Sequence, residues 1–568
     1  MLNRILVVLL VSALAPVARA QTIVVQGPGV LTGDASMPPR DPNAPRRTGT
    51  AVLRGRVVAS DSGQPLRKAQ VRVSSPELRE NRLATTDANG KYEFKELPAG
   101  RYNLSVSKGS YVSLQFGQTR PFEPGKPLEI QDAQTIEKVD FSLPRGSVVT
   151  GRIVDEFGEP ATDVMVTLQR YQNMSGRRRL VPSGRPSTTN DIGEFRLFAI
   201  PPGQYYLSAS MRNAQMSPFD SSDDRSGYAP TYFPGTPNVA EAQRVTVGVG
   251  QTITDLAMAL IPTKLARVSG SAVDSRGRAM SGMVMALPRG ADMIGSMMMQ
   301  PGQIRPDGTF QINGVAAGTY TLQANFGNSG PDSESASVDV TVNGEDVNDV
   351  HLVGAKPSAV TGRLVVDPAA AQTLRPSTMR VGMTPVQTDG IVFNTSGPAM
   401  VNDDLTFEAK ARPGQMRLQV NPLPAGWGIR AVRYRATDVT DSGLDIRPNE
   451  DVGDVEIELT NRMPEVSGQV TNARGAIVKD YTVVVFPEDR ERWTNNPRYV
   501  RSGRPDQDGR YKITSLPPGS YLIVALDQVE QGEWMDPDFL ERMRPKASAF
   551  GIAEGETKSF DLKLNSAS

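Results

Sequence analysis

The sequence predicts an all-β protein, built as a tandem array of five antiparallel, seven-stranded β-sandwiches. Two repeated patterns lead to this prediction. Glycines ten residues apart recur in similar surroundings, at Gly90/Gly100, Gly193/Gly203, Gly308/Gly318 and Gly509/Gly519. An apolar-x-Gly-x-apolar stretch precedes each pair and also opens a fourth unit, centred on Gly55, Gly151, Gly270, Gly362 and Gly468. Internal repetition at this length indicates an array of one small module.

The opening stretch of each unit is expected to be a half-buried strand. In Val149-Thr-Gly151-Arg-Ile153 the apolar residues alternate with others, so they fall on one face of the strand. Glycine is unfavourable in the middle of a strand unless another backbone or side chain passes close by. We therefore expect a close approach at each of these glycines.

The glycine pairs are expected to mark two turns around one strand. Asn89-Gly90 and Asp508-Gly509 are typical of tight hairpin turns. The later glycine follows proline, as in Pro201-Pro-Gly203, and starts a Gly-x-Tyr-x-Leu strand. Short strands separated by such turns over about 100 residues are typical of a seven-stranded sandwich.

The predicted boundaries follow from the repeat. The fourth unit is degenerate, because Leu405 stands in place of the first glycine, nine residues before Gly414. We expect a signal peptide over 1–20, a disordered Pro-rich linker over 21–48, and sandwiches over 49–145, 146–264 (with an aromatic insert), 265–355, 356–462 and 463–568. These five ranges are called modules one to five.

The stretch Thr86–Leu104 resembles the carboxypeptidase regulatory-like domain, through the motif T-D-x-x-G-x-Y/F-x-F-x-x-L-P-x-G-x-Y-x-L. The match is closest in modules one, two and five, weaker in three and weakest in four. The resemblance implies an Ig-like or transthyretin-like sandwich, grouped with carbohydrate-binding-like folds, and an accessory role. It implies no peptidase, since the zinc catalytic domain is missing. The segment Tyr228–Thr236 resembles one found in bacterial exported proteins built from such modules.

Composition points to an exported chain that is not inserted in a membrane. Arg4, an apolar run and Ala18-Arg19-Ala20 make a signal peptide, and no later apolar segment is long enough to span a bilayer. There is no cysteine, so disulfides and thiolate sites are excluded. Lys+Arg and Asp+Glu are equal at 62 each, which gives no reason to expect nucleic acid as a partner. The location is expected to be periplasmic or extracellular.

Modules follow one another almost without linkers. Phe141–Gly146 leads directly into the opening strand of module two, and Leu459–Pro464 into that of module five. This continuity favours an extended rod and a monomer.

The candidate ligand-binding residues are aromatic: Tyr228, Tyr232 and Phe233 in the insert of module two, and Trp493 in a polar loop of module five. Exposed rings could stack on sugars or on a peptide. The alternative is that the rings of the insert pack onto their own sandwich or against module three. Trp534 to Met543 is expected to form a short helix whose apolar side covers the sandwich.

Chemistry of other kinds finds little support. His351 is the only histidine and is expected to lie in a closing strand, so no catalytic triad and no histidine-rich metal site is expected. Thioethers are soft ligands, so the triplet Met297–Met299 could bind Cu(I), although we do not expect it to. We expect no catalytic residue, metal or cofactor.

The sequence therefore predicts a non-catalytic, exported binding or scaffold protein. It would contact carbohydrate, or an envelope or extracellular protein, through loops of modules two and five. One alternative is a purely structural spacer or adhesin stalk, whose loops pack inward. Another is a glycan-active enzyme, which requires two carboxylates about 5 to 9.5 Å apart in a cleft.

Overall fold

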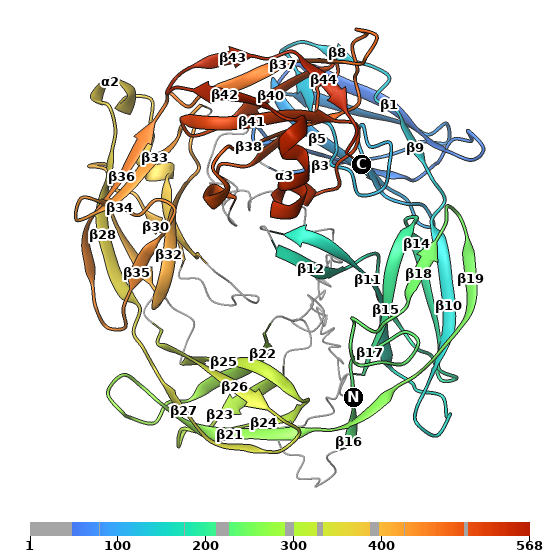
Figure 1. Cartoon of the computed structure of the whole chain (residues 1–568), viewed down its shortest axis with the longest axis vertical. Helices are drawn as coiled ribbons and strands as arrows, with labels where there is room; N and C mark the ends of the chain where they lie inside the picture. The colour runs from blue at the N-terminus through green and yellow to red at the C-terminus, as the bar shows by residue number, and fades with distance from the viewer. Residues whose placement is uncertain are drawn as a thin grey trace, which may run out of the picture. The chain divides into compact units, whose positions relative to one another are not determined.

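The chain is an all-β protein with several sheets, seen in a computed structural model (Figure 1). The structure describes residues 48–567, except 79, 175–176, 212–225, 290–299, 327–332, 387–396, 425 and 494–497. The signal peptide, nearly all of the linker and the Met297–Met299 triplet lie outside the described residues. Among those described, no helix has the length and apolar character needed to cross a membrane.

Each of the five predicted ranges contains its own buried apolar cluster. The clusters run from Ala51 to Leu143, Val149 to Leu260, Ala266 to Leu352, Val360 to Leu459 and Val466 to Leu562. Their bounds agree with the repeat, although the division into five separate domains stays a prediction.

Module one has two layers of strands that enclose its cluster. One layer joins β4, β1 and β8, with β9 also on β1, and the other joins β3, β2, β5 and β6, with β7 also on β5. The strands are β1 (Ala51–Ala59), β2 (Gln70–Ser74), β3 (Arg82–Thr85), β4 (Lys91–Leu97), β5 (Gly100–Ser107), β6 (Leu114–Gln115), β7 (Leu128–Ile130), β8 (Thr135–Ile136) and β9 (Phe141–Leu143).

Module two repeats this plan, with a longer connection after β15 (Gly203–Met211). The sheet β14-β10-β19 faces the sheet built on β11 and β15. The strands are β10 (Ser147–Val154), β11 (Val164–Met174), β12 (Arg177–Pro182), β13 (Ser187–Thr188), β14 (Glu194–Ile200), β15 (Gly203–Met211), β16 (Ser226–Ala229), β17 (Thr231–Tyr232), β18 (Arg244–Val247), β19 (Thr252–Ala259) and β20 (Ile261–Lys264).

The strands of module three are joined in one continuous seven-stranded sheet, whereas those of module four form a five-stranded and a four-stranded sheet. In module three the strands are β21 (Ala266–Val273), β22 (Gly282–Pro288), β23 (Gln300–Ile304), β24 (Thr309–Val315), β25 (Gly318–Phe326), β26 (Ser335–Val342) and β27 (Val347–Val353). Module four contains β28 (Ser358–Val365), α2 (Pro368–Ala371), η1 (Pro376–Thr378), β29 (Arg380–Pro385), β30 (Ala399–Met400), β31 (Thr406–Ala411), β32 (Gly414–Asn421), β33 (Gly428–Tyr434), β34 (Thr437–Asp438), β35 (Leu444–Ile446) and β36 (Val452–Thr460).

Module five adds helical turns to the same set of strands. Its elements are β37 (Glu465–Thr471), β38 (Thr482–Pro487), η2 (Arg490–Arg492), β39 (Arg501–Gly503), β40 (Arg510–Thr514), β41 (Gly519–Leu526), η3 (Glu533–Met535), α3 (Pro537–Met543), η4 (Arg544–Lys546), β42 (Ser548–Ile552), β43 (Thr557–Ser559) and β44 (Leu562–Asn565).

The prediction of purely antiparallel sheets is wrong. The opening strand of each module pairs antiparallel with the strand after the Asn/Asp turn, but it pairs parallel with the closing strand, as β10 does with β19 and β21 with β27. The hairpin signals that support the prediction report only strands that are neighbours in sequence. Val149 and Ile253, which face each other across β10 and β19, are too far apart in the chain for such a signal.

The close approach expected at the mid-strand glycines is confirmed. A Cβ on Gly151 would lie 2.0 Å from the carbonyl oxygen of Leu256, and a Cβ on Gly270 would lie 1.9 Å from that of Val350. In both modules the closing strand is irregular at this point, with a positive φ at the preceding residue, Asp255 or Asp349. Only glycine leaves room for the carbonyl that the irregularity directs at the opening strand.

The tyrosine of the Gly-x-Tyr strand fixes the preceding turn. The hydroxyl of Tyr205 donates a hydrogen bond to the carbonyl oxygen of Pro201 at 2.6 Å, and that of Tyr521 donates to Pro517 at 2.7 Å. Modules one and three repeat this bond, from Tyr102 to Pro98 and from Tyr320 to Ala316. Burial raises the pKa of Tyr205 to about 12, so the hydroxyl stays a donor beyond the pH at which an exposed tyrosine ionises.

Candidate functional site

Trp493 is a core residue of module five. It is 4% exposed, its indole Nε1 donates to the carbonyl oxygen of Pro487 at 2.7 Å, and its ring meets Phe486 edge-on at 5.6 Å. The 3-10 turn η2 precedes it, capped by the side chain of Asp489. The charged residues around Trp493 therefore lie outside while the indole points inward.

The aromatic insert of module two packs onto its own sandwich. Tyr232 is 8% exposed and shares a small cluster with Leu180 and Tyr206. Phe233 is half-buried against the module's main core, and its amide donates to the carbonyl oxygen of Leu207 at 3.0 Å. Both residues follow β15, on which β17 and β18 pair.

Tyr228 lies at the other end of the insert, on β16, which pairs with β20. Its ring packs against the main core, and its hydroxyl donates to Glu156 Oε2 at 2.5 Å. This hydrogen bond, more than burial, raises the pKa of Tyr228 to about 12. The ring is thus held by a neighbour in its own module.

The structure does not bring the four candidate residues together as one exposed surface. Trp493 belongs to a cluster of module five, and the other three pack within module two. Stacking on a sugar requires an open ring face. Tyr232 and Trp493 have almost none to offer, so carbohydrate binding by these residues stays a prediction.

The expectation for Trp534 to Met543 is confirmed in its main point. The segment between β41 and β42, residues 527–547, carries η3 and α3 and is called the module-five cover (Figure 1). Its Trp534, Phe539, Leu540 and Met543 are buried against the outer face of β38 and β41, together with Phe486 and Trp493. The cover therefore lies over a sheet face and gives module five a second apolar core.

His351 lies on β27 as expected, with its Nδ1 2.9 Å from Ser271 Oγ. Within the described part of the chain, no three His, Cys, Asp or Glu residues are grouped as they would be to hold a metal ion. The aspartates of the hairpin turns cap backbone amides instead. Asp87 Oδ1, for example, accepts from the amides of Asn89 and Lys91, both at 2.8 Å.

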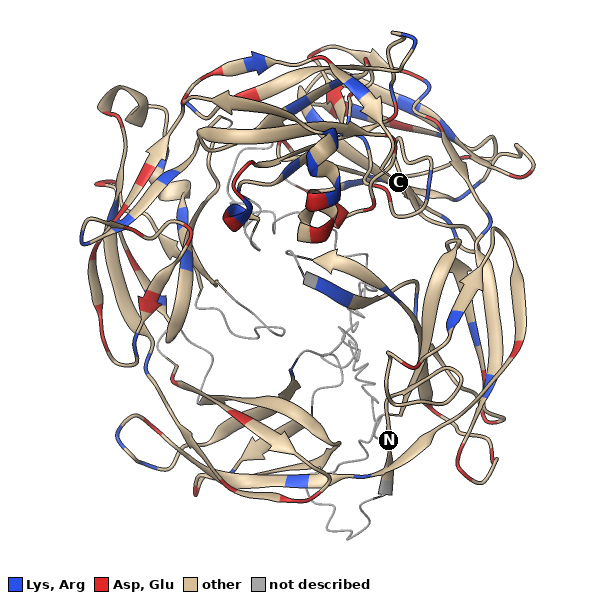
Figure 2. Cartoon of the chain, viewed as in Figure 1, with Lys and Arg blue, Asp and Glu red and all other residues tan. Residues whose placement is uncertain are grey.

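Charged side chains of both signs are interspersed over the modules, and α3 carries both (Figure 2). This distribution agrees with the equal numbers of acidic and basic residues. Individual ion pairs nevertheless join side chains of different modules.

One such group of pairs involves a loop of module one, residues 116–127, here called the junction loop. The loop connects β6 to β7 and is held in shape from within. The buried carboxylate of Glu123 accepts from the Thr119 hydroxyl and the Arg120 amide, both at 3.2 Å. The Lys126 amide closes the loop onto the carbonyl oxygen of Phe116 at 2.7 Å.

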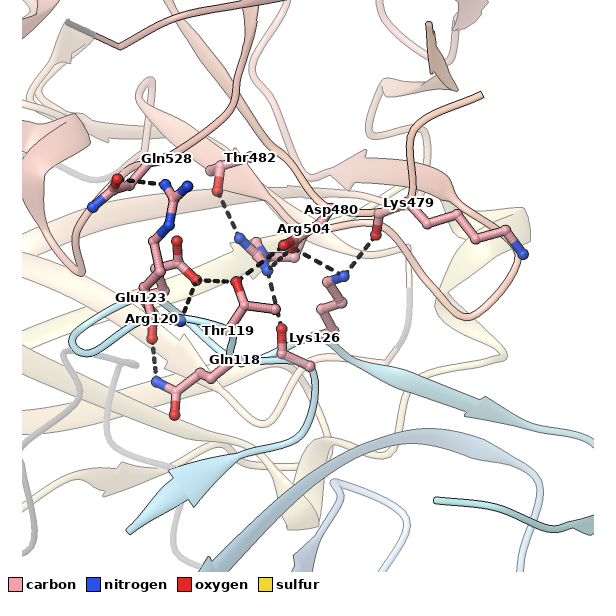
Figure 3. A network of polar contacts seen from close by, with 12 residues as sticks. Gln118, Thr119, Arg120, Glu123, Lys126, Lys479, Asp480, Thr482, Arg504 and Gln528 are labelled. Atoms are coloured by element: carbon pink, nitrogen blue, oxygen red, sulfur yellow. Dashed lines mark hydrogen bonds and ion pairs between the residues drawn. The ribbon is translucent and has the colours of Figure 1, made fainter. Parts of the chain in front are cut away.

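The junction loop makes polar contacts with module five, centred on Asp480 (Figure 3). Lys126 Nζ lies 3.0 Å from Asp480 Oδ1, and Oδ2 lies 3.0 Å from the Thr119 hydroxyl, whose one proton is shared between Asp480 and Glu123. Arg504 Nη2 donates to Asp480 Oδ1 at 2.7 Å and to the carbonyl oxygen of Gly117 at 3.3 Å. The Arg504 side chain is 4% exposed and that of Lys126 15%, so these charges are largely removed from water.

The pKa values in this network report both burial and pairing. Burial opposes the ionised form of Asp480, but Lys126, Arg504 and the Thr119 hydroxyl outweigh it, and the pKa of Asp480 lies below its usual value. Burial lowers the pKa of Lys126, and Asp480 offsets only part of this effect. Asp480 lies between two largely buried cations. Removing it would leave both cations without their counter-charge, which is strongly destabilising for buried groups.

The same loop also contacts module two. The Phe122 ring lies under the guanidinium of Arg170, with 3.5 Å from Cζ to the ring centroid. Arg170 is 9% exposed and also pairs with Glu530 Oε2 of the module-five cover at 2.9 Å. The Gln531 amide of the cover donates to the carbonyl oxygen of Phe122 at 2.8 Å. Phe122 thus contacts modules two and five at once.

The prediction of an extended rod does not accommodate these contacts, because a rod keeps modules one and five apart. Sequence reasoning considers only how one module leads into the next. The junction loop reads as an ordinary Gly/Pro-containing loop, and nothing local marks Asp480 or Arg504 as its partners. The sequence feature that does mark these contacts is the length of one connection between strands. The connection after the Gly-x-Tyr strand spans residues 108–127, 212–243 and 527–547 in modules one, two and five, but only 327–334 in module three.

Comparison with known proteins gives a family match for module one. Residues 52–144 match the family model of the carboxypeptidase regulatory-like domain, which confirms the resemblance for that module. The resemblance of the remaining modules stays a prediction. No curated protein matches the sequence.

Solved structures similar to this chain include bacterial pilins. The Streptococcal ancillary pilin is 15% identical over 54% of this chain and 98% of its own, with a TM-score of 0.19. GBS52, the minor pilin of Streptococcus agalactiae, is 12% identical over 37% of this chain and 96% of its own, with a TM-score of 0.21. BcpA, the major pilin subunit of Bacillus cereus, is 10% identical over 54% and 99%, with a TM-score of 0.14. Scores this low carry no argument about ligands, partners or assembly.

Proposed function

We propose that the protein is a non-catalytic, exported scaffold whose β modules are held against one another. The observation that carries this proposal is the inward packing of its loops. Trp493, Trp534 and Tyr232 are all at least nine-tenths buried, and each lies in a segment that covers a sheet of its own module. Inward-packed loops distinguish a structural role from a displayed aromatic binding surface.

The contacts between modules support the same proposal. Besides the junction loop, Gln507 of module five exchanges hydrogen bonds with the backbone of Glu129 in module one, at 3.3 and 3.2 Å. Arg498 of module five donates to the carbonyl oxygens of Ile429 and Arg430 in module four, at 3.0 and 2.7 Å. A scaffold needs such bonds to fix module positions, whereas modules on flexible linkers do not.

The direct test is a glycan array with the purified mature chain, together with a release assay on mixed polysaccharides. The scaffold proposal predicts no glycan bound specifically and no sugar released. Specific binding would return the aromatic residues to consideration as a lectin site. Sugar release would support the glycan-active alternative.

A second candidate function is contact with a protein partner, favoured by an exposed apolar tip on module two. Phe157 is 83% exposed and Ile192 49% exposed. Their turns are neighbours, since the Gly193 carbonyl accepts from the amide of Ile153, at the end of the strand that leads into the turn of Phe157. Large exposed apolar side chains grouped on a surface often mark protein contacts.

A photoreactive amino acid at position 157 tests this candidate in envelope extract. Val249, which is 68% exposed in another turn of module two, is the matched control position. A product at 157 that is absent at 249 supports a partner at the tip. Equal labelling at both positions, or none, counts against it.

Export itself is open to a simple measurement. Expression of the full chain in a bacterium should give a mature protein in the periplasm or medium that begins at Gln21. A cytoplasmic product that retains Met1 would contradict the export part of the proposal.

A further inference from the structure

Long connections of modules one and five occupy the same place in the repeat and meet each other. The junction loop lies in the connection from β5 to β7 of module one, after the short β6, and the module-five cover follows β41, which is the corresponding Gly-x-Tyr strand. Arg120 Nη1 of the loop donates to Gln528 Oε1 of the cover at 2.5 Å, next to the bond from Gln531 to Phe122. Two insertions with no counterpart in module three are thus partners.

The cover is also fitted to module two at a point where no side chain could be placed. A Cβ on Gly532 would lie 2.0 Å from the carbonyl oxygen of Asn173, and Gly532 has a φ of +84°. Close by, Asn173 Nδ2 donates to Asp536 Oδ2 at 3.2 Å and Gln172 Nε2 to the carbonyl oxygen of Gln531 at 3.3 Å. The backbone of β11 therefore reaches the cover directly.

We propose that the junction loop is a docking element whose partner is module five of the same chain. With Arg170 of module two it forms a clasp that joins the first, second and last modules in solution. The proposal rests on the scaffold role and deepens it, because it names the contacts that hold the first, second and last modules together.

Charge complementarity identifies the occupant. The loop offers Lys126 to a carboxylate that Arg504 already orients, and Arg170 meets Glu530 of the cover. These pairs form only if module five is turned towards modules one and two together. Because all three belong to one chain, the docking is intramolecular, and tethering raises the effective concentration of the partner into a range where modest contacts suffice. A second copy of the chain could supply the same face, so the test must separate the two sources.

A zero-length carbodiimide cross-link reads this contact in the unaltered protein. The reagent activates the Asp480 carboxylate, and Lys126 Nζ then displaces the activating group to form an amide, with net loss of one water. Trypsin should release residues 109–138 joined to residues 480–490, since neither the bond between Arg120 and Pro121 nor that between Lys126 and Pro127 is cleaved. Lys512 and Glu465, 2.8 Å apart within module five, give an internal reference link.

Equal amounts of ¹⁵N-labelled and unlabelled chain are mixed, refolded together from denaturant and then cross-linked. The proposal predicts a Lys126–Asp480 link with a yield within about threefold of the reference link, and with both peptides from the same isotope pool. Pairs of mixed isotope would assign the contact to two copies and overturn the intramolecular docking. A reference link without the Lys126–Asp480 link would overturn the clasp altogether.

Asp480→Asn is the matched control. It keeps the size of the side chain and removes the group that the reagent activates. The Lys126–Asp480 link must disappear in this variant while the Lys512–Glu465 link remains, which shows that module five is still folded. A persistent product that joins the same two peptides would mean that another carboxylate, such as Glu488 or Asp489, is the partner, and would contradict the assignment to Asp480. The glycan array and the release assay test separately whether the protein binds or cleaves glycans, so a failure there is distinguishable from a failure of the clasp.

Discussion

Modules two and five carry an insertion at the same connection, and they use it to different extents. In module five the cover buries a helix against β38 and β41, and Trp493 and Val500 complete a second core. In module two the corresponding described segment contributes Tyr232, with Val239 and Ala242 packed around it, to a small cluster on Leu180 and Tyr206. The difference shows that one structural position can hold either a thin cap or a full additional layer.

The two apolar clusters also differ in what borders them. The cluster of module five is covered by the helix α3, whose N-terminus is capped by Asp536, which accepts from the Asp538 amide. The module-two cluster ends in polar groups, where Arg244 Nε donates to the Tyr206 hydroxyl at 3.0 Å. We therefore expect stability to depend strongly on the insertion in module five and moderately in module two.

The largest expected effect is that of Phe539→Ala in the module-five cover. Phe539 is fully buried, so truncation should lower the free energy of unfolding of module five by about 3–5 kcal/mol. Denaturant unfolding followed by tryptophan emission measures this, since Trp493 and Trp534 belong to the same cluster. Phe157→Ala, at an exposed position, is the control and should stay within about 0.5 kcal/mol of the parent chain. Equal effects of the two variants would mean that the cover is not packed.

Tyr232→Ala should have a smaller effect. The cluster around Tyr232 is small and partly open, so we expect a loss of about 2 kcal/mol, confined to module two. Hydrogen exchange of peptides from β15 and β18, read by mass spectrometry, locates the change. Faster exchange in module five would show that the insertions of modules two and five are coupled, and would contradict their separate contributions to stability.

Tyr205→Phe and Tyr521→Phe should give similar losses in the two modules. Each variant leaves a proline carbonyl without its hydroxyl donor, at a cost of about 1–2 kcal/mol. The same exchange experiment, read on β15 and β41, measures both. Because this bond belongs to the repeat and not to the insertions, a loss several times larger in one module would contradict the view that only the insertions differ.

The smallest expected effect concerns Glu533, at the edge of the module-five cover. Burial raises the pKa of this carboxyl above its usual value, although the Glu530 amide donates to Oε2 at 3.0 Å. A raised folded pKa means that the ionised form costs stability at neutral pH, and that this cost is relieved as the pH falls through the folded pKa. Glu533→Gln should therefore stabilise module five slightly at pH 7.

The advantage of Glu533→Gln should shrink as the pH approaches about 4.5, the ordinary range of a glutamate. Midpoints of denaturant unfolding at several pH values between 4 and 7 test this. An advantage that grows towards acid would mean that the carboxylate is stabilised, and not penalised, by its surroundings.

Sequence alone predicts the parts of this fold that repeat. The glycine at the centre of each opening strand predicts the close approach of a carbonyl group, as at Gly151. The Asn/Asp-Gly turns also form where they are expected. These features depend on neighbours within one module. The parallel pairing of opening and closing strands is missed, because it joins the two ends of a module and no local pattern encodes it.

The candidate site shows the limit most clearly. Trp493 stands among Arg490, Glu491 and Arg492, and a polar neighbourhood predicts an exposed ring. The 3-10 turn η2 places these charges outside and turns the indole inward, which follows from three-dimensional packing alone. Asp480 and Lys126 are found only through the structure, since each belongs to an unremarkable loop of a different module.

The central claim is that the tryptophans, above all Trp493, which the sequence offers as an exposed ring, are core residues of a scaffold. Fluorine NMR of the chain labelled with 5-fluorotryptophan tests it on all three tryptophans at once. Trp427, Trp493 and Trp534 are each at most 8% exposed, so each resonance should barely move between H₂O and D₂O. Trp493→Phe identifies the decisive resonance. A solvent shift of that resonance as large as in the unfolded chain would place the indole in water and contradict the claim.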